Sequence, residues 1–233
     1  MTIDMNEKKL REDMCEIARM MYVKGLICGP AGNISARLEK GLFLLTPSIF
    51  FKQRLKPDQL IIVDDKGNKV GPQTHANRDL MPTSETSMHL QTYQNRPDVG
   101  AIVHAHPSFC VALSVAGKKI RPQVLTEAML FLGAIAEAEY QTPTSDELGA
   151  EVGRLMLNHD CVLLPYHGVT VAGKDMWEAC AKLEVLEQTA QICTLVEQLG
   201  GEKPLAQAHV KDMLKLRQNW GLAKPSDSDL LHQ

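Results

Sequence analysis

Several features that would place the protein in a special class are scarce or missing from its sequence. No apolar run reaches the ~18 residues that a membrane-spanning helix needs, and the charged N-terminal segment lacks the apolar core of a signal peptide. Lys and Arg (25) are fewer than Asp and Glu (28), and no basic run offsets the net charge of −3, as a nucleic-acid-binding protein would require. We therefore expect a cytoplasmic protein whose partners include neither a membrane nor a nucleic acid.

Cysteine pairs are also absent. Six cysteines occur, but none forms a CxxC pair, and a chain of 233 residues buries enough surface to fold without disulfides. We interpret the six thiols as reduced, buried structural residues. An α/β chain of this length is commonly one domain, so we predict a single domain over residues 1–233. A C-terminal helix and tail would begin at about residue 205, and the polar tail from Lys224 is expected to be loose.

Hydrophobic periodicity divides the chain into a mixture of helices and strands. Helices are predicted over residues 4–24, 83–95, 107–116, 145–158, 175–199 and 206–219. Strands are predicted over residues 33–38, 42–45, 60–63, 99–105, 135–139, 161–164 and 169–172, with a long loop over 70–81. Hairpin turns such as Lys40-Gly41 recur between the strands, so we expect an α/β fold whose sheet is at least partly antiparallel and covered by helices.

Two histidines end a buried strand, in the segment His104-Ala105-His106. Residues i and i+2 of a strand point to the same side, so both imidazoles would project together. Neutral imidazole is a good ligand for Zn²⁺ and other divalent ions. The pair is therefore either half of a metal site or two polar histidines at a sheet edge. The remaining histidines outside the bend at His167 (75, 89, 159, 209 and 232) lie in polar or helical surface patterns and are predicted to face solvent.

Two further residues could complete a metal site. His167 lies beside Gly168 at a bend between two apolar strands, where it could point into a cleft or be an ordinary turn residue. Glu85 falls in the first turn of the predicted helix 83–95, where a carboxylate could act in catalysis or only favour the positive end of the helix dipole. Three imidazoles and one carboxylate together would hold a metal ion with an exchangeable position, as a catalytic metal site requires.

Three short segments offer hydrogen-bond donors to an anion. The glycine-containing turn over 29–35 has exposed backbone N–H groups, Ser48 adds a hydroxyl, and Thr83-Ser84 adds two more at a helix N-terminus. None of the segments matches a Walker or dinucleotide fingerprint. Ordinary turn and cap chemistry explains each of them alone, but their combination favours a phosphate site.

Taken in order, five motifs resemble the class II aldolase/adducin family, of which fuculose-phosphate aldolase is the best-known enzyme. The resemblance covers about residues 5–200 and is carried by GlyAsnIleSer (32–35), ThrProSer (46–48), ProThrSerGlu followed by MetHisLeu (82–90), HisAlaHisPro (104–107) and TyrHisGly (166–168). It implies a three-layer α/β/α sandwich with a mixed, mostly antiparallel central sheet. It also implies a homotetramer whose active sites lie between subunits.

The resemblance gives each motif a role. His104, His106 and His167 resemble the family's metal-binding histidines, and Glu85 resembles the acidic residue that approaches the metal and acts as acid and base. One divalent ion per subunit is implied, with Zn²⁺ as the first choice and Mn²⁺ or Co²⁺ as alternatives. Gly32, Asn33, Thr83 and Ser84 resemble the phosphate-binding positions, and Ser48 offers a further hydroxyl for the same anion.

From this resemblance we expect an aldolase, a lyase that cleaves a short ketose phosphate into a dihydroxyacetone phosphate-like fragment and an aldehyde through a metal-stabilised enediolate. A decarboxylase, a dehydratase or a 4-epimerase could use the same site. An adducin-like non-catalytic module would not need the histidines and Glu85 that this chain retains. Ile49 stands where the family has glycine, and tyrosine is absent both at 125–126 and after Tyr166. These departures argue against L-fuculose phosphate itself as the substrate.

Overall fold

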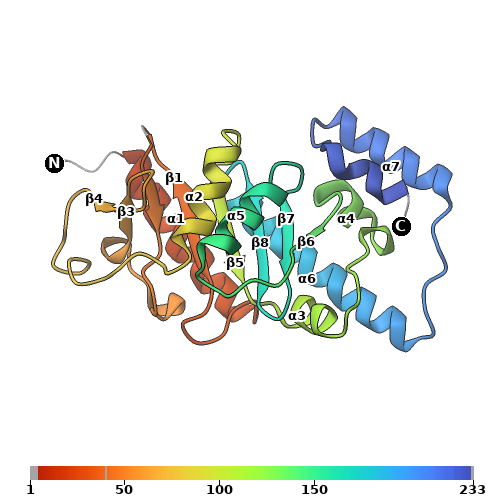
Figure 1. Cartoon of the computed structure of the whole chain (residues 1–233), viewed down its shortest axis with the longest axis horizontal. Coiled ribbons are helices and arrows are strands. Elements are labelled where there is room, and N and C mark those ends of the chain that lie inside the picture. Colours follow the sequence, from red (N-terminus) through yellow and green to blue (C-terminus); the bar gives the residue numbers. More distant parts are fainter. Residues whose placement is uncertain (1–4, 40, 232–233) are drawn as a thin grey trace.

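The computed structural model describes residues 5–39 and 41–231 and contains an eight-stranded sheet (Figure 1). The strands follow the order β4-β3-β2-β1-β5-β8-β7-β6, and neighbouring strands are antiparallel except for the parallel pair β6–β7. Their bounds are β1 (Asn33–Arg37), β2 (Phe43–Leu45), β3 (Ile61–Val63), β4 (Lys69–Val70), β5 (Ala101–Ala105), β6 (Ala136–Glu137), β7 (Cys161–Leu164) and β8 (Gly168–Gly173).

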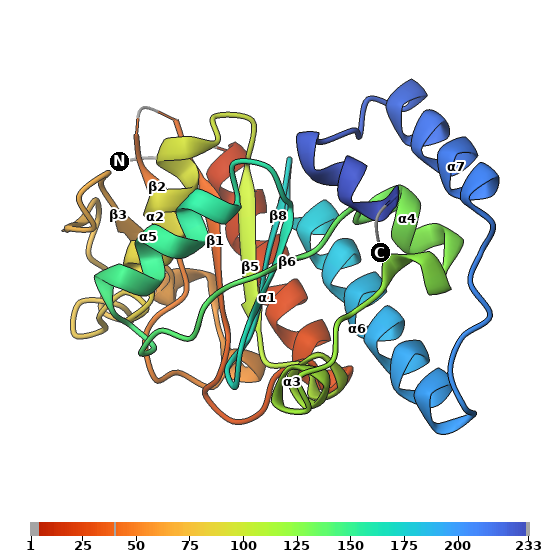
Figure 2. The same ribbon diagram turned by 45° about the vertical axis from the view of Figure 1, so that its right-hand side comes forward.

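Helices cover both faces of this sheet. The α-helices are α1 (Met5–Val23), α2 (Thr86–Asn95), α3 (Ser108–Val115), α4 (Thr126–Phe131), α5 (Asp146–Leu155), α6 (Met176–Gln198) and α7 (Gln207–Asn219). Short 3₁₀ helices are η1 (Lys52–Arg54), η2 (Pro57–Gln59), η3 (Pro122–Val124) and η4 (Pro225–Leu231). Figure 2 shows α2 and α5 side by side on one side of the sheet and α1 and α6 on the other.

The side chains of β5 explain why both faces are covered. Ala101, Val103 and Ala105 belong to the apolar core that includes α1, α3 and α6, whereas Ile102 belongs to the core that includes α2 and α5. A strand that is apolar on both sides of its pleat must be covered on both sides. The three-layer α/β/α sandwich with a mixed, mostly antiparallel sheet is thereby confirmed.

The predicted helices and strands are present, and the differences lie at their ends and in short elements. α2 begins at Thr86 rather than Thr83, so Glu85 is the N-cap residue and not a first-turn residue. We did not predict β4, α4 or the 3₁₀ helices, because these short elements show neither a helical period nor the apolar run that marks the short strands. Residue 4, Lys40 of the predicted turn and His232 lie outside the described residues.

The expectation of a loose tail from Lys224 is wrong. The guanidinium of Arg217 in α7 is buried and lies 2.7 Å from a carboxylate oxygen of Asp227 in η4. Leu230 is fully buried in a small core together with Met129 of α4 and Val210 of α7. The tail has few apolar residues, but the sequence could not show that one buried ion pair and one leucine dock it against α4.

The cysteines are largely as predicted. All six are free thiols, and five are buried, but Cys28 is exposed because it lies in the turn that precedes β1. Burial raises the pKa of the Cys15 and Cys180 thiols to about 11, which keeps them protonated and unreactive. Within the described part of the chain, no helix has the length and apolar character needed to cross a membrane.

Candidate metal centre and anion pocket

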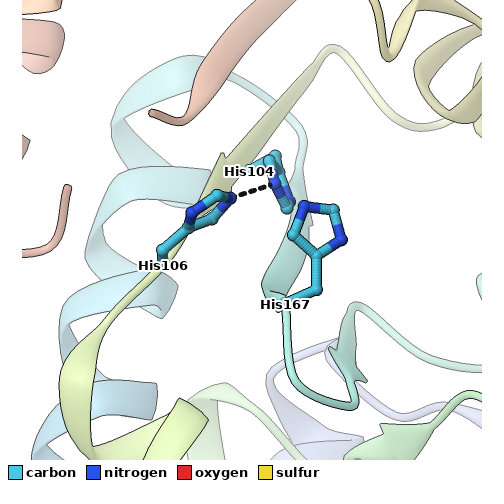
Figure 3. A group of neighbouring side chains, drawn as sticks. All are labelled: His104, His106 and His167. Atoms are coloured by element: carbon cyan, nitrogen blue, oxygen red, sulfur yellow. Dashed lines mark hydrogen bonds between the residues drawn. The ribbon is translucent and has the colours of Figure 1, made fainter. Parts of the chain in front are cut away.

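Three histidines meet at one end of the central strands. His104 lies on β5, His106 directly follows that strand, and His167 precedes β8. β5 and β8 are paired neighbours, with Ala105 opposite Val169, and this pairing brings the turn before β8 beside the end of β5. The Nε2 atoms of His104 and His106 are 2.9 Å apart, and one candidate ligand nitrogen from each ring lies within 4.8 Å of the others. Figure 3 shows the three rings converging.

All three imidazoles favour the neutral form. Burial lowers the pKa of His106 to about 4 and holds the pKa of the fully buried His104 well below its usual value. Burial also lowers the pKa of His167, although the carboxylate of Glu85 opposes that shift. A neutral imidazole keeps a nitrogen lone pair, which is what a metal ion needs from it.

Glu85 faces this cluster from the N-terminus of α2. Its Oε2 lies 3.1 Å from His104 Nε2, and its Oε1 lies 3.3 Å from His167 Nε2. The side-chain amide of Asn33 donates a 2.9 Å hydrogen bond to Oε2, while Oε1 is buried without a hydrogen-bond partner. The side chain makes no capping hydrogen bond to α2, so helix stabilisation alone does not explain its position.

This donor set fits a divalent cation. An unpaired buried carboxylate oxygen is unfavourable, and a cation bound by three neutral imidazole nitrogens would satisfy it. Nitrogen-rich ligands with one carboxylate are a set that Zn²⁺ accepts, and Mn²⁺ or Co²⁺ also bind such ligands. His104, His106, His167 and Glu85, all singled out from the sequence, therefore lie together in an arrangement suited to a metal ion.

A cavity of about 290 Å³ opens beside Glu85, His106 and His167. All five residues predicted to bind phosphate line it: Gly32, Asn33, Ser48, Thr83 and Ser84. Gly32 has a φ of +73°, and a side chain there would meet the Ile27 side chain and the His104 carbonyl, so only glycine fits. His104 is the one predicted residue that does not line the cavity, because it is fully buried behind the other two imidazoles.

Lys52 lines the same cavity and was not predicted. Its ammonium group is buried and donates to the backbone carbonyls of Pro30 and Phe50 at 3.0 and 2.9 Å, with Pro47 at 3.5 Å. No carboxylate among the described residues forms an ion pair with it, and burial lowers its pKa to about 8. A lysine on a short, aperiodic segment carries no sequence signal for burial, so only the fold reveals this cation.

His89 corrects another prediction, because it is fully buried rather than solvent-facing. It lies on the face of α2 that packs on β1, where its Nδ1 is 2.6 Å from Ser35 Oγ and its Nε2 is hydrogen-bonded to Asn33 Oδ1. The spacing of Glu85, His89 and Tyr93, each four residues apart, places them on one face of a helix. That spacing was the available signal that His89 and Glu85 share a face.

Three residues other than glycine have positive φ in the described chain, and all are at or beside this cavity. Ile49 (φ 47°) and Thr144 (φ 70°) line it, and Tyr166 (φ 60°) precedes His167. Positive φ is costly for β-branched and bulky residues. Such conformations concentrate at functional sites, where the surrounding structure imposes them, so their clustering marks this cavity independently of its chemistry.

Comparison with known proteins agrees with this geometry. A family model described as the class II aldolase and adducin N-terminal domain matches residues 12–194. The chain belongs to the class II aldolase and adducin family. Membership supports an enzyme of the lyase type and a sugar-phosphate substrate, and enzymes of this family use a divalent metal.

Relatives within the family carry out two kinds of reaction. An L-fuculose phosphate aldolase of Methanococcus maripaludis is 34% identical over 186 residues, which are 79% of this chain and 96% of the relative. A 3-oxo-tetronate 4-phosphate decarboxylase of Haemophilus influenzae is 31% identical over 216 residues, 90% of this chain and 98% of the relative. A solved L-fuculose 1-phosphate aldolase has a TM-score of 0.81 and 25% identity, covering 91% of this chain and 96% of that one.

Proposed function

We propose that the protein is a metal-dependent aldolase that cleaves a short ketose phosphate into a dihydroxyacetone phosphate-like fragment and an aldehyde. The observation that carries this proposal is the position of Glu85. Its carboxylate lies 3.1 and 3.3 Å from two neutral histidines, at the wall of a cavity lined by donors for an anion. A proton-transfer group, a metal-ligand set and an anion pocket thus share one site.

The histidines and Glu85 have different roles in this proposal, metal binding and proton transfer. His104, His106 and His167 would hold one divalent ion per subunit, and Zn²⁺ suits their nitrogen ligands. When bound, such an ion supplies Lewis-acid stabilisation of the negative charge that develops on the substrate oxygens. Glu85 moves the proton at the carbon next to the ketone, giving it after cleavage and removing it before condensation.

The cavity walls hold the phosphate group. Backbone N–H groups near Gly32 and the hydroxyls of Ser48, Thr83 and Ser84 donate hydrogen bonds to it, and these are strong because the acceptor is charged. Lys52 adds the only lysine or arginine charge among the lining residues. Asn33 lines the cavity too, but both ends of its amide are already hydrogen-bonded to Glu85 and His89.

Decarboxylation of a 3-oxo sugar-acid phosphate is the second candidate, and two observations favour it. The decarboxylase relative matches 90% of this chain, against 79% for the aldolase relative. Aldol cleavage also needs a group that handles the proton of the hydroxyl on the aldehyde fragment. The family's tyrosines would perform this task, and this sequence has no tyrosine at 125–126 or after Tyr166. Loss of carbon dioxide has no such hydroxyl and needs only protonation at carbon, which Glu85 can provide.

One experiment separates the two reactions. The metal-loaded protein is incubated with a panel of ketose 1-phosphates and with 3-oxo-tetronate 4-phosphates, and dihydroxyacetone phosphate and carbon dioxide are measured separately. Release of dihydroxyacetone phosphate from a ketose phosphate, with no carbon dioxide from the acids, is the expected result. Loss of the C1 carboxylate from a 3-oxo-tetronate 4-phosphate leaves dihydroxyacetone phosphate, so the two reactions are told apart by substrate and by carbon dioxide. Carbon dioxide and dihydroxyacetone phosphate from the acids, with no dihydroxyacetone phosphate from any ketose 1-phosphate, would replace the aldolase by the decarboxylase. Neither product, together with no bound metal, would favour the adducin-like module.

We also propose that the protein assembles as a homotetramer with its sites between subunits, as the family resemblance implies. Ile49, which lines the cavity, and Met81, whose carbonyl accepts from the Ser48 backbone, are exposed at 85% and 67%, and burial of such side chains against a neighbouring copy is favourable. The mass measured by light scattering during size-exclusion chromatography tests this assembly. A monomer at micromolar concentration would contradict it.

A further inference from the structure

A continuous chain of buried side chains runs from Glu85 into the interior between α2 and β1. The Asn33 amide donates to Glu85 Oε2 at 2.9 Å, and its carbonyl oxygen is hydrogen-bonded to His89 Nε2. His89 Nδ1 lies 2.6 Å from Ser35 Oγ, which lies 2.8 Å from the Tyr93 hydroxyl. All five residues are buried, with exposures of 7% or less.

Two periodicities build this chain. Asn33 and Ser35 are i and i+2 on β1, so both side chains point to the same face of the sheet. His89 and Tyr93 lie four residues apart on α2, and Glu85, the N-cap residue, lies four residues before His89, so the three side chains follow one side of the helix. The side chains on β1 face those along α2, and hydrogen bonds join the two sets.

Chemistry sets the direction of every hydrogen bond in the chain. An ionised carboxylate only accepts, so the amide nitrogen of Asn33 must face Glu85 and its oxygen must face His89. That oxygen also only accepts, so the proton of His89 must be on Nε2. Burial lowers the pKa of His89 to about 3, so the ring carries one proton only and Nδ1 must accept from the Ser35 hydroxyl. The Tyr93 hydroxyl then donates to Ser35.

We propose that His89 is a positioning residue that locks the Asn33 amide, and through it the carboxylate of Glu85, in the orientation needed for proton transfer. The proposal rests on the function proposed above for Glu85. Without the His89 N–H, the Asn33 amide can turn over and present its oxygen to Glu85. Two oxygens would then repel each other, and Oε2 would lose the donor that holds it.

The proton on His89 tests the proposal without any activity assay. Two-dimensional ¹H–¹⁵N spectra correlate the carbon-bound protons of the imidazole ring with both of its nitrogens. In the wild-type protein these spectra distinguish the two neutral tautomers of His89. We expect the Nε2–H tautomer throughout pH 5–9. Observation of the Nδ1–H tautomer or of a protonated ring would overturn the proposed direction, whatever reaction the protein catalyses.

Two substitutions of similar chemistry test the consequence for catalysis. In His89→Gln the terminal amide reaches the position of Nε2 and can still donate to Asn33, whereas in His89→Asn it reaches only the position of Nδ1. We expect His89→Asn to lower kcat by about 10²-fold, the typical cost of a misplaced catalytic group, with little change in KM. His89→Gln should recover at least a tenth of the wild-type kcat.

A matched control separates positioning from stability. Thr92 is also fully buried on α2, but its hydroxyl donates to the Met88 carbonyl and takes no part in the chain. Thr92→Val should therefore leave kcat unchanged even if its melting temperature falls. Equal kcat in His89→Asn, His89→Gln and the wild type would overturn the positioning role. Absence of lyase activity in the wild type would instead count against the proposed function and leave the tautomer result standing.

Discussion

The two oxygens of Glu85 lie in different surroundings, and this difference supports the proton-transfer role proposed for this residue. Oε2 accepts from Asn33 and is held, whereas Oε1 is buried with no hydrogen-bond partner. A base must be oriented and must also have a lone pair available to the substrate. Asn33 orients the carboxylate through Oε2, and no residue in the described part of the chain donates a hydrogen bond to Oε1.

Glu85→Gln tests this reading at the residue scale. The three histidines remain, so most of the metal should stay bound, and the nearly isosteric amide should leave the melting temperature within a few degrees. General acid–base catalysis contributes about 10²–10⁴-fold, so kcat should fall by that factor on the best substrate. Turnover above roughly a tenth of the wild-type rate at equal metal loading would show that Glu85 does not transfer the proton.

Lys52 leads to a pH-dependent prediction. The pKa of its ammonium is about 8, below the ordinary value of 10.5, so it is charged at neutral pH and loses its charge as the pH rises through 8. Inorganic phosphate is mostly the dianion at pH 7.5 and only gains negative charge up to pH 9.5, so weaker phosphate binding across that window would report Lys52. We expect this weakening in the wild type and not in Lys52→Met, whose binding at pH 7.5 should already be about tenfold weaker, equivalent to ~1.4 kcal/mol.

The control for this measurement is Lys56→Met, which removes an exposed lysine from the same segment. Isothermal titration calorimetry with inorganic phosphate measures both variants and the wild type. A pH profile in Lys52→Met that follows the wild type would exclude Lys52 as the source of the effect, and an equal change in Lys56→Met would attribute it to net charge.

At the scale of elements, the site depends on two packing relations rather than on one motif. The pairing of β5 with β8 brings His167 to His104 and His106, although about 60 residues separate them along the chain. The packing of α2 on β1 brings Glu85 to Asn33 and to the imidazoles. Neither relation is local in sequence, so shifts in strand register would separate the residues while leaving each motif intact.

His104→Asn and His106→Asn test the end of β5 as a metal-binding element. Each substitution removes a ligand nitrogen, and we expect bound metal to fall below about a tenth of an ion per subunit because a site with three protein ligands tolerates little loss. The circular dichroism spectrum should keep its native shape, since β5 pairs with β1 and β8 through backbone hydrogen bonds. The exposed His209→Asn is the control and should keep its metal. Full occupancy in both β5 variants would contradict the assignment.

At the scale of the whole molecule, one buried carboxylate joins parts of the chain that are far apart. Asp160, just before β7, lies 2.8 Å from Lys182 of α6, 3.0 Å from Arg96 at the end of α2 and 3.4 Å from Lys224 before η4. Burial opposes its ionisation, but Lys182, Lys224 and Arg96 together hold the pKa of Asp160 below its ordinary value. The carboxylate therefore connects both helical layers and the C-terminal segment.

Asp160→Asn should destabilise the fold by about 3 kcal/mol, because removing one partner leaves buried cations uncompensated. Since the pKa of Asp160 is lower in the folded than in the unfolded protein, its contribution is present above pH 4 and is lost as the pH falls further. Urea unfolding at pH 7 and pH 3 measures both effects, and the variant should lose less stability between these pH values than the wild type does.

Asp98→Asn is the matched control, because Asp98 also binds Arg96 but its side chain is 58% exposed. Exposed ion pairs contribute no more than about 1 kcal/mol, so this variant should stay close to the wild type. Equal losses of unfolding free energy in Asp98→Asn and Asp160→Asn would show that the burial of Asp160 does not increase its contribution to stability.

The sequence by itself determined the layered α/β architecture and the metal-ligand candidates. Both depend on local periodicity: apolar strands with period two, helices with period near four, and an i, i+2 histidine pair that shares one side of a strand. Residue type and spacing made His104, His106, His167 and Glu85 candidates, and the resemblance to the class II aldolase/adducin family joined them into one site. The fold brings the four side chains together as expected.

Only the tertiary structure decided the burial of polar residues. His89 and Lys52 are of residue types that usually face solvent, and the sequence around them does not reveal which element covers them. β1 covers His89, and the Pro30 carbonyl reaches the Lys52 ammonium from a loop 22 residues earlier in the chain. Burial depends on how helices and strands pack against one another. The sequence pattern shows which side of each element is apolar, but not which polar or charged side chain a distant element covers.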